Sequence, residues 1–188
     1  MSTTVQRSDA AANRDRVVTA ARGVFVERGL DAEMKEIADR AGLGVGTIYR
    51  NFATKDELVE AVIASCMADS MVEIRAAMAV EEPGPRIIAL AGVGWSSAER
   101  FGPLIRALGM PRQVSEQHPA RELLELVAQA FREGLAAGVV HPGLDPEFAA
   151  NYLASQFHAY VDLRQLHPES RVRAQMTELF QRAVLVCY

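Results

Sequence analysis

The sequence of 188 residues predicts an all-α fold, and three observations support that prediction. Apolar residues recur at the i, i+3, i+4, i+7 spacing of an amphipathic helix in most segments of the chain. The strict alternation of a half-buried strand is nearly absent. Glycine and proline residues mark the breaks between the helical segments.

The first helix is expected to follow a flexible arm over residues 1–12, which are small and polar. Asn13 is a suitable cap for this helix, and Gly29 ends it. Asp31 is the expected cap of the next helix.

Two short helices follow. The apolar stripe of the first, over residues 34–41, consists of Met34, Ile37, Ala38 and Ala41. Gly42 stands where a helix ends in the left-handed conformation. Gly44 then opens a second helix that runs from Val45 to about Asn51. Two short helices joined by a glycine-containing turn form a helix-turn-helix, although a generic helical hairpin with a polar outer face is the alternative.

The second short helix carries side chains that suit contact with DNA. Ile48 and Phe52 lie four residues apart and can anchor this helix to a core. The remaining positions supply hydroxyl, guanidinium and amide groups, which bind phosphates and base edges. We therefore expect a DNA-binding surface that consists of Val45, Thr47, Tyr49, Arg50, Asn51 and Lys55.

Several unrelated residue types at fixed spacing resemble the DNA-binding signature of the TetR family of bacterial transcriptional regulators. They are Phe25, Gly29, Ile37, Ala38, Ala41, Gly42, Gly46, Thr47, Tyr49, Phe52, Lys55 and Leu58. The resemblance implies a helix-turn-helix DNA-binding domain over 13–56 and a helical ligand-binding and dimerisation domain over 57–188. It also implies a homodimer that pairs through its last two helices. Asp31 and Gly44 depart from the serine or threonine that the family favours at these helix starts.

A long helix is expected from Lys55 to about Val80, with no glycine or proline inside it. Thr54 and Glu57 form a capping box at its start, in which the Glu57 carboxylate reaches back to Thr54. After a break at 81–85 we expect a helix over 86–97 and an interruption at Phe101-Gly102-Pro103. A short helical piece over 104–108 and a loop over 109–118 follow.

Three further helices complete the prediction. The first runs from Pro119 to Ala137 and is closed by Gly138. The second has Asp145 as its cap and Pro146 at its first position, and reaches about Leu166. The third is expected over 170–186. The last two helices carry apolar residues over a wider arc than one core requires, which agrees with pairing between subunits.

We expect no catalytic site, no metal site and no cofactor, because no nucleophile motif or phosphate-binding glycine loop is present. The four histidines lack the spacing of metal ligands. A largely apolar ligand pocket is expected from Trp95, Phe101, Met110, Phe131, Phe157, His158 and Tyr160. The same residues would equally make an ordinary core.

The net charge of −4 is unusual for a DNA-binding protein, but it is unevenly distributed. Residues 1–56 carry nine basic and eight acidic residues, 9 − 8 = +1, whereas residues 57–188 carry 11 − 16 = −5. DNA affinity must therefore come from the local placement of Arg14, Arg16, Arg50 and Lys55. Two cysteines without a spacing motif, and no signal-peptide or membrane-spanning run, indicate a cytoplasmic protein.

These features predict a ligand-responsive transcriptional regulator, and we expect a repressor that a small, largely apolar molecule releases from double-stranded operator DNA. The alternative is an activator or an effector-independent regulator of the same fold. A helical small-molecule-binding module without a DNA role is a further alternative, which Tyr49 and Arg50 argue against.

Overall fold

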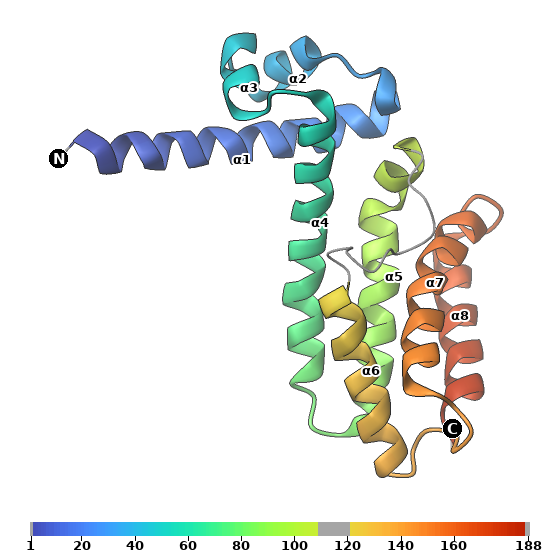
Figure 1. Cartoon of the computed structure of the whole chain (residues 1–188). Coiled ribbons are helices and arrows are strands. Elements are labelled where there is room, and N and C mark those ends of the chain that lie inside the picture. Colours follow the sequence, from blue (N-terminus) through green and yellow to red (C-terminus); the bar gives the residue numbers. More distant parts are fainter. Residues whose placement is uncertain (1, 109–120, 187–188) are drawn as a thin grey trace. The chain divides into compact units, whose positions relative to one another are not determined.

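The computed structural model describes residues 2–108 and 121–186, with side chains from residue 11 onward. The described residues form helices, as predicted, and their one β-type contact is an isolated bridge between Val140 and Leu185. The helices are α1 Ser2–Arg28, α2 Met34–Ala41, α3 Val45–Asn51, α4 Lys55–Met78, α5 Pro83–Ala107, α6 Arg121–Ala136, α7 Pro146–Leu163 and α8 Glu169–Val184, with a short 3-10 turn at Gly29–Asp31 (Figure 1).

The chain divides into two compact units. Unit 1 consists of Met1–Cys66 and Pro103–Met110, and unit 2 consists of Met67–Gly102 and Pro111–Tyr188. We placed the division after residue 56, whereas unit 1 also contains the first turns of α4 and the last turn of α5.

Unit 1 is a small helical domain around an apolar core. Its most deeply buried side chains are Val17, Ala21, Phe25, Ile37, Ile48, Phe52, Leu58 and Val62, each fully shielded from solvent. The α1 helix begins at Ser2, so Asn13 lies inside the helix and is not its cap. As predicted, α1 ends before Gly29, which has a positive φ of 60°.

The α4 helix is continuous and starts at Lys55, as predicted. The backbone N–H of Glu57 donates to the Thr54 hydroxyl at 3.1 Å, which confirms that half of the capping box. The Glu57 carboxylate accepts from the backbone N–H of Ala53 at 2.8 Å, so the expected return contact to Thr54 is wrong by one residue.

The α5 helix contradicts the predicted interruption. It runs from Pro83 to Ala107 and includes Phe101, Gly102 and Pro103. Pro103 has no N–H to donate to the carbonyl of Glu99, but one missing hydrogen bond does not end a helix that is packed on both sides of it. Gly102 is buried, and a Cβ at this position would lie 2.5 Å from Cγ2 of Val161. The glycine therefore permits close approach of α5 to α7.

The end of α6 and the start of α7 follow local signals. Gly138 closes α6 with φ 71°, and the Asp145 carboxylate caps α7 by accepting from the backbone N–H of Phe148 at 2.7 Å; both were predicted. The predicted start of α6 at Pro119 and the predicted loop over 109–118 lie outside the described residues. Beyond α8, the bridge between Val140 and Leu185 ties the chain end to the α6–α7 connection.

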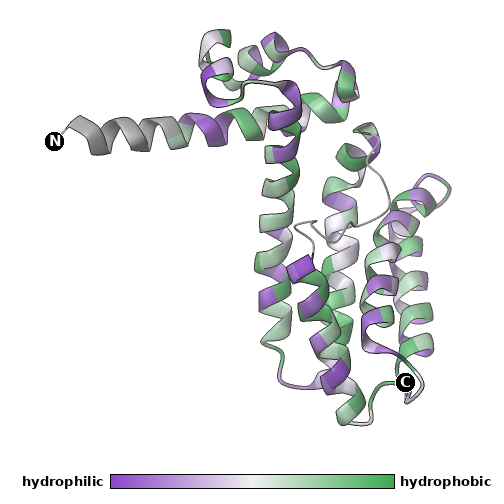
Figure 2. Cartoon of the chain, in the orientation of Figure 1, coloured by the Kyte–Doolittle hydropathy of each residue, from purple (hydrophilic) through white to green (hydrophobic). Residues whose placement is uncertain are grey.

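The core of unit 2 is formed by all five of its helical segments. Hydrophobic residues recur along each of them (Figure 2). The largest buried side chains include Ile87, Trp95, Phe131, Tyr160 and Phe180. The Trp95 and Phe180 rings meet edge to face, with their centroids 6.1 Å apart.

Candidate DNA-binding surface

The α2 helix is held at both ends by its own sequence. Its cap is Glu33 and not Asp31, because the Glu33 side chain accepts from the backbone of Glu36 while Glu36 accepts from the backbone N–H of Glu33 at 2.9 Å. This capping box places Met34 at the first buried position of the helix. At the other end Gly42 is left-handed, with φ 65°, as predicted.

The turn after Gly42 brings α3 against α2 as a helix-turn-helix (Figure 1). The Leu43 N–H donates to the carbonyl of Ala38 at 3.0 Å, which closes the end of α2. Gly44 is the cap of α3 and has no side chain to satisfy the free N–H groups there. The backbone N–H groups of Val45 and Gly46 therefore receive no acceptor from a capping side chain.

The α3 helix turns one side chain inward and most of the others outward. Ile48 is fully buried, and Phe52, directly after the helix, is fully buried too. Tyr49 is 53% exposed and Val45 44% exposed. Arg50 is exposed and donates to no described residue, whereas Thr47 is half-buried. The predicted surface residues of α3 thus lie together on one accessible helix.

Asn51 and Lys55 are engaged within unit 1, although we predicted them for DNA. The Asn51 amide donates to the Thr47 carbonyl at 2.8 Å. The Lys55 ammonium donates to the carbonyls of Leu30 at 2.6 Å and Ala32 at 3.3 Å. Lys55 therefore holds the connection between α1 and α2, and one of its three N–H donors remains for a phosphate.

Two arginines of α1 also donate to backbone carbonyls. Arg14 Nη1 donates to the carbonyl of Asn51 at 2.9 Å, and Arg16 Nη2 donates to the carbonyl of Ala41 at 2.8 Å. Asn51 and Ala41 are the last residues of α3 and α2. Charge and composition could not reveal these contacts, because they join residues 37 and 25 positions apart.

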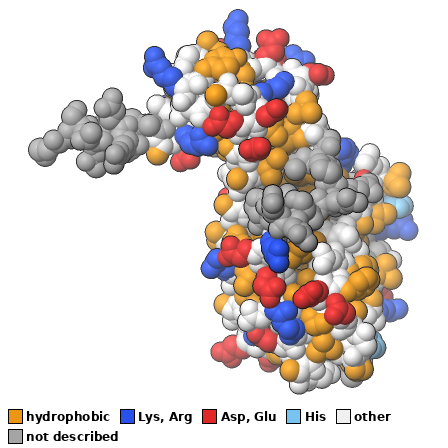
Figure 3. Space-filling view, viewed as in Figure 1, with side chains coloured by type: hydrophobic (Ala, Val, Ile, Leu, Met, Phe, Trp, Pro, Cys, Tyr) orange, Lys and Arg blue, Asp and Glu red, His pale blue; other side chains and the backbone are white. Residues whose placement is uncertain are grey.

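Two ion pairs join further charges of unit 1. Arg28 bonds Glu36 at 3.1 Å, and Arg40 bonds Glu27 at 2.7 Å. The Arg40 hydrogen bond lowers the pKa of Glu27, and the Glu33 backbone N–H followed by Arg28 lowers that of Glu36. Figure 3 shows acidic and basic side chains interspersed over unit 1.

Four of the predicted ligand-binding residues lie in or against one apolar cluster, the core of unit 2. Trp95, Phe131 and Tyr160 are buried in the core of unit 2, with Phe157 packed against it. The Phe157 ring also contacts that of His158, with centroids 5.5 Å apart. Phe101 lies outside this cluster, under the guanidinium of Arg100 at 5.1 Å. Met110 lies outside the described residues.

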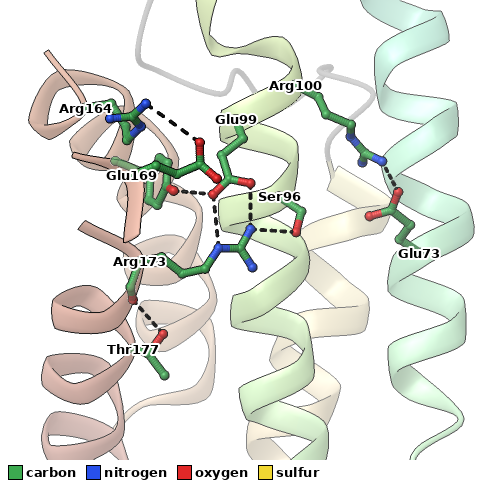
Figure 4. Close-up of polar contacts among 9 residues, drawn as sticks. Glu73, Ser96, Glu99, Arg100, Arg164, Glu169, Arg173 and Thr177 are labelled. Atoms are coloured by element: carbon green, nitrogen blue, oxygen red, sulfur yellow. Dashed lines mark hydrogen bonds and ion pairs between the residues drawn. The ribbon is translucent and has the colours of Figure 1, made fainter. Parts of the chain in front are cut away.

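A polar group interrupts this core where α5, α7 and α8 meet (Figure 4). The Glu99 carboxylate accepts from Arg173 at 2.7 and 3.1 Å and from the Tyr160 hydroxyl. Burial opposes the charge on Glu99, but the hydrogen bonds from Arg173 and Tyr160 outweigh it and hold the pKa of Glu99 below its usual value. Burial, followed by the Glu99 hydrogen bond, raises the pKa of Tyr160 to about 12.

Other kinds of site find no support in the described parts of the chain. No three His, Cys, Asp or Glu side chains there come together as metal ligands. None of the described helices is long and apolar enough to cross a bilayer. An open hollow of about 490 Å³ on unit 1 is lined by residues of α1 and α2, and contains none of the predicted ligand-binding residues.

The helix-turn-helix lies in a part of the sequence that is similar to known proteins. Residues 17–62 match the sequence model described as bacterial regulatory proteins, tetR family. A transcriptional repressor of Mycolicibacterium smegmatis, KstR2, is 39% identical over 57 residues, which are 30% of this chain and 28% of the relative. The chain thus matches less than a third of that relative's length.

Solved structures are similar over nearly the whole chain. The ketosteroid transcriptional regulator KstR2 of Mycobacterium tuberculosis superposes with a TM-score of 0.70 at 19% identity, and covers 92% of this chain and 94% of its own. A γ-butyrolactone receptor superposes with a TM-score of 0.70 at 22% identity, and covers 95% of this chain and 91% of its own. At these identities the likeness shows a shared fold.

Proposed function

We infer that this chain, whose residues 17–62 match the tetR family of bacterial regulatory proteins, is a transcriptional regulator that binds double-stranded DNA through α3. The observation that carries the proposal is the α2–turn–α3 unit within the matched residues. Its second helix exposes Val45, Tyr49 and Arg50 and buries only Ile48. A helix of this kind docks in a major groove, with its N-terminal residues at base edges.

Homodimerisation is the second part of the proposal. The α7 and α8 helices carry large apolar side chains that are exposed in the single chain: Phe148 and Leu179 at 65% and Tyr152 at 39%. Exposed apolar patches of this kind commonly mark protein interfaces. A two-fold pair would place two recognition helices in successive major grooves, about 34–36 Å apart.

Control by a small molecule is the third part, and Trp95 supports it. Its indole Nε1 is buried and donates to no acceptor among the described residues. Buried donors are normally satisfied, so an acceptor atom on a largely apolar effector would suit this position. The names of the KstR2 repressor and the γ-butyrolactone receptor favour a ligand-responsive repressor of this fold.

Release from DNA sets a thermodynamic condition on the effector. It must bind the DNA-incompetent arrangement more tightly than the competent one, because a ligand shifts an equilibrium only by its difference in affinity. In this proposal the effector binds unit 2, and α4, which contributes residues to both units, is the continuous element that connects that site to α3.

The test is to select bound fragments from the source genome with the purified chain, and then to measure affinity for the selected duplex. Tyr49→Ala should weaken binding about tenfold through loss of the phenol, whereas Val72→Ala, at an exposed position of α4, should leave it unchanged. Failure of the folded wild-type chain to enrich any fragment would refute the proposal.

A further inference from the structure

The α3 helix depends on neighbouring elements for its position. It has seven residues, and isolated helices shorter than about 12 residues are marginal in water. Two buried side chains, Ile48 and Phe52, anchor it to the core of unit 1. The Phe52 N–H donates to the carbonyl of Ile48 at 2.9 Å, but the carbonyls that follow it in α3 still need donors from outside the helix.

Arg14 supplies a donor at this end of α3. Its Nη1 donates to the carbonyl of Asn51 at 2.9 Å, while its guanidinium carbon lies 4.1 Å from the centroid of the Phe52 ring. A planar guanidinium can stack on a ring and donate in its own plane at the same time, which a lysine ammonium cannot do. The positive charge also interacts favourably with the negative partial charge at the C-terminal end of the helix.

The contacts of Arg14 differ from those expected of an arginine that binds phosphate. Arg50 on α3 is exposed and donates to no described residue, so its charge is available to DNA. Arg14 is exposed too, but its guanidinium lies over the Phe52 ring, directly after α3, and one of its donors bonds the carbonyl of Asn51, the last residue of α3. Asn51, the residue whose carbonyl it holds, in turn donates its side-chain amide to Thr47 in the same helix.

We propose that Arg14 is a positioning residue that fixes the C-terminal end of α3, and thereby sets the discrimination between operator and other DNA. This inference rests on the proposed DNA-binding function. Loss of the guanidinium frees the last turn of α3, so base contacts that need a fixed helix weaken. General phosphate attraction changes little, because the number of phosphates neutralised stays the same.

The experiment compares Arg14→Met, Arg14→Lys and Arg50→Met in the full chain. Affinity is measured for the genome-selected duplex and for a scrambled duplex of equal length, over a series of salt concentrations. In both Arg14 variants the affinity for the selected duplex should fall about tenfold, and the affinity for the scrambled duplex should fall less than about twofold. The salt dependence of binding should keep its slope. Arg50→Met should lower the slope by about one.

A second measurement needs no DNA and so separates this inference from the proposed function. Amide hydrogen exchange of α3 should be faster by about tenfold in both Arg14 variants, with α2 as the internal reference. Unchanged exchange in α3 would overturn the positioning role. The positioning role would also be overturned if affinity for both duplexes fell equally and the salt slope fell by about one. Full retention of selectivity in Arg14→Lys would overturn it too, because either result marks Arg14 as a phosphate contact.

Discussion

Replacement of Gly102 by alanine tests why a glycine stands at this position of α5. We expect the reason to be close packing against α7 and not the conformational freedom of its backbone. The added Cβ would lie 2.5 Å from Cγ2 of Val161, with Cγ1 at 3.4 Å and Cβ at 3.5 Å. Carbon atoms pack best at about 3.5–4.0 Å, so the side chains must separate by about an ångström. Val161 is β-branched and has few alternative rotamers in a helix.

The expected size of the effect follows from two opposing terms. Overpacking of a well-filled core costs about 1–3 kcal/mol, whereas alanine in a helix is better than glycine by about 0.8–1.0 kcal/mol. The propensity gain is shared by Gly92→Ala in the same helix, where a Cβ would meet no atom within 4 Å. The difference in unfolding free energy between the two variants therefore isolates the packing cost, about 1–3 kcal/mol.

Urea unfolding followed by tryptophan fluorescence measures this difference directly. The chain has one tryptophan, Trp95, which lies in the core of unit 2 and so reports on that unit. Gly92→Ala should raise the free energy of unfolding and Gly102→Ala should lower it relative to Gly92→Ala. Equal stabilisation by both alanines would show that α7 yields at Val161 without cost, and would refute the packing argument.

Three further predictions concern assembly, coupling and pH. Leu179→Glu should convert the dimer to monomer in sedimentation velocity, whereas Val72→Glu, also on an exposed surface, should not; a wild-type monomer at micromolar concentration would contradict the interface. Ser70→Pro should reduce the change in operator affinity caused by effector, because it breaks α4, whereas Ser70→Ala, which removes the 3.0 Å contact with Ser97 but leaves the helix backbone unbroken, should keep it; an unaltered ratio in a folded Ser70→Pro protein would exclude this route. Glu99→Gln should be less stable than wild type at neutral pH, and this gap should close in acid. The reason is that folding lowers the Glu99 pKa from 4.5, so its stabilisation is lost as pH falls through the lower folded value; a gap independent of pH would contradict it.

The C-terminal end of α2 and the starts of α3 and α7 could be predicted because their signals are local. Gly42 and Gly44 bound the turn, and Asp145 caps α7 within three residues of its partner. The cap of α2 was misassigned to Asp31 because another carboxylate, Glu33, stands two residues later. The capping box with Glu36 and the burial of Met34 decide between them, and both depend on the exact start of the helix.

Contacts between distant residues account for what the sequence could not predict. The Lys55 ammonium meets carbonyls 25 and 23 residues away, so a residue that reads as a phosphate contact also holds a loop. In α5, Gly102 and Pro103 carry the composition of a break, but the packing of Gly102 against Val161 preserves the helix. Tertiary packing overrides local propensity in such places.

The division of labour within α3 bears on how operator preference can be changed. Within this helix Ile48 is buried in the core, while Val45, Tyr49 and Arg50 are exposed to solvent in the unbound chain. Substitutions at exposed positions usually alter stability by less than about 0.5 kcal/mol. A library randomised at these three positions should therefore yield mostly folded proteins, from which variants with new operator sequences can be selected without rebuilding the scaffold.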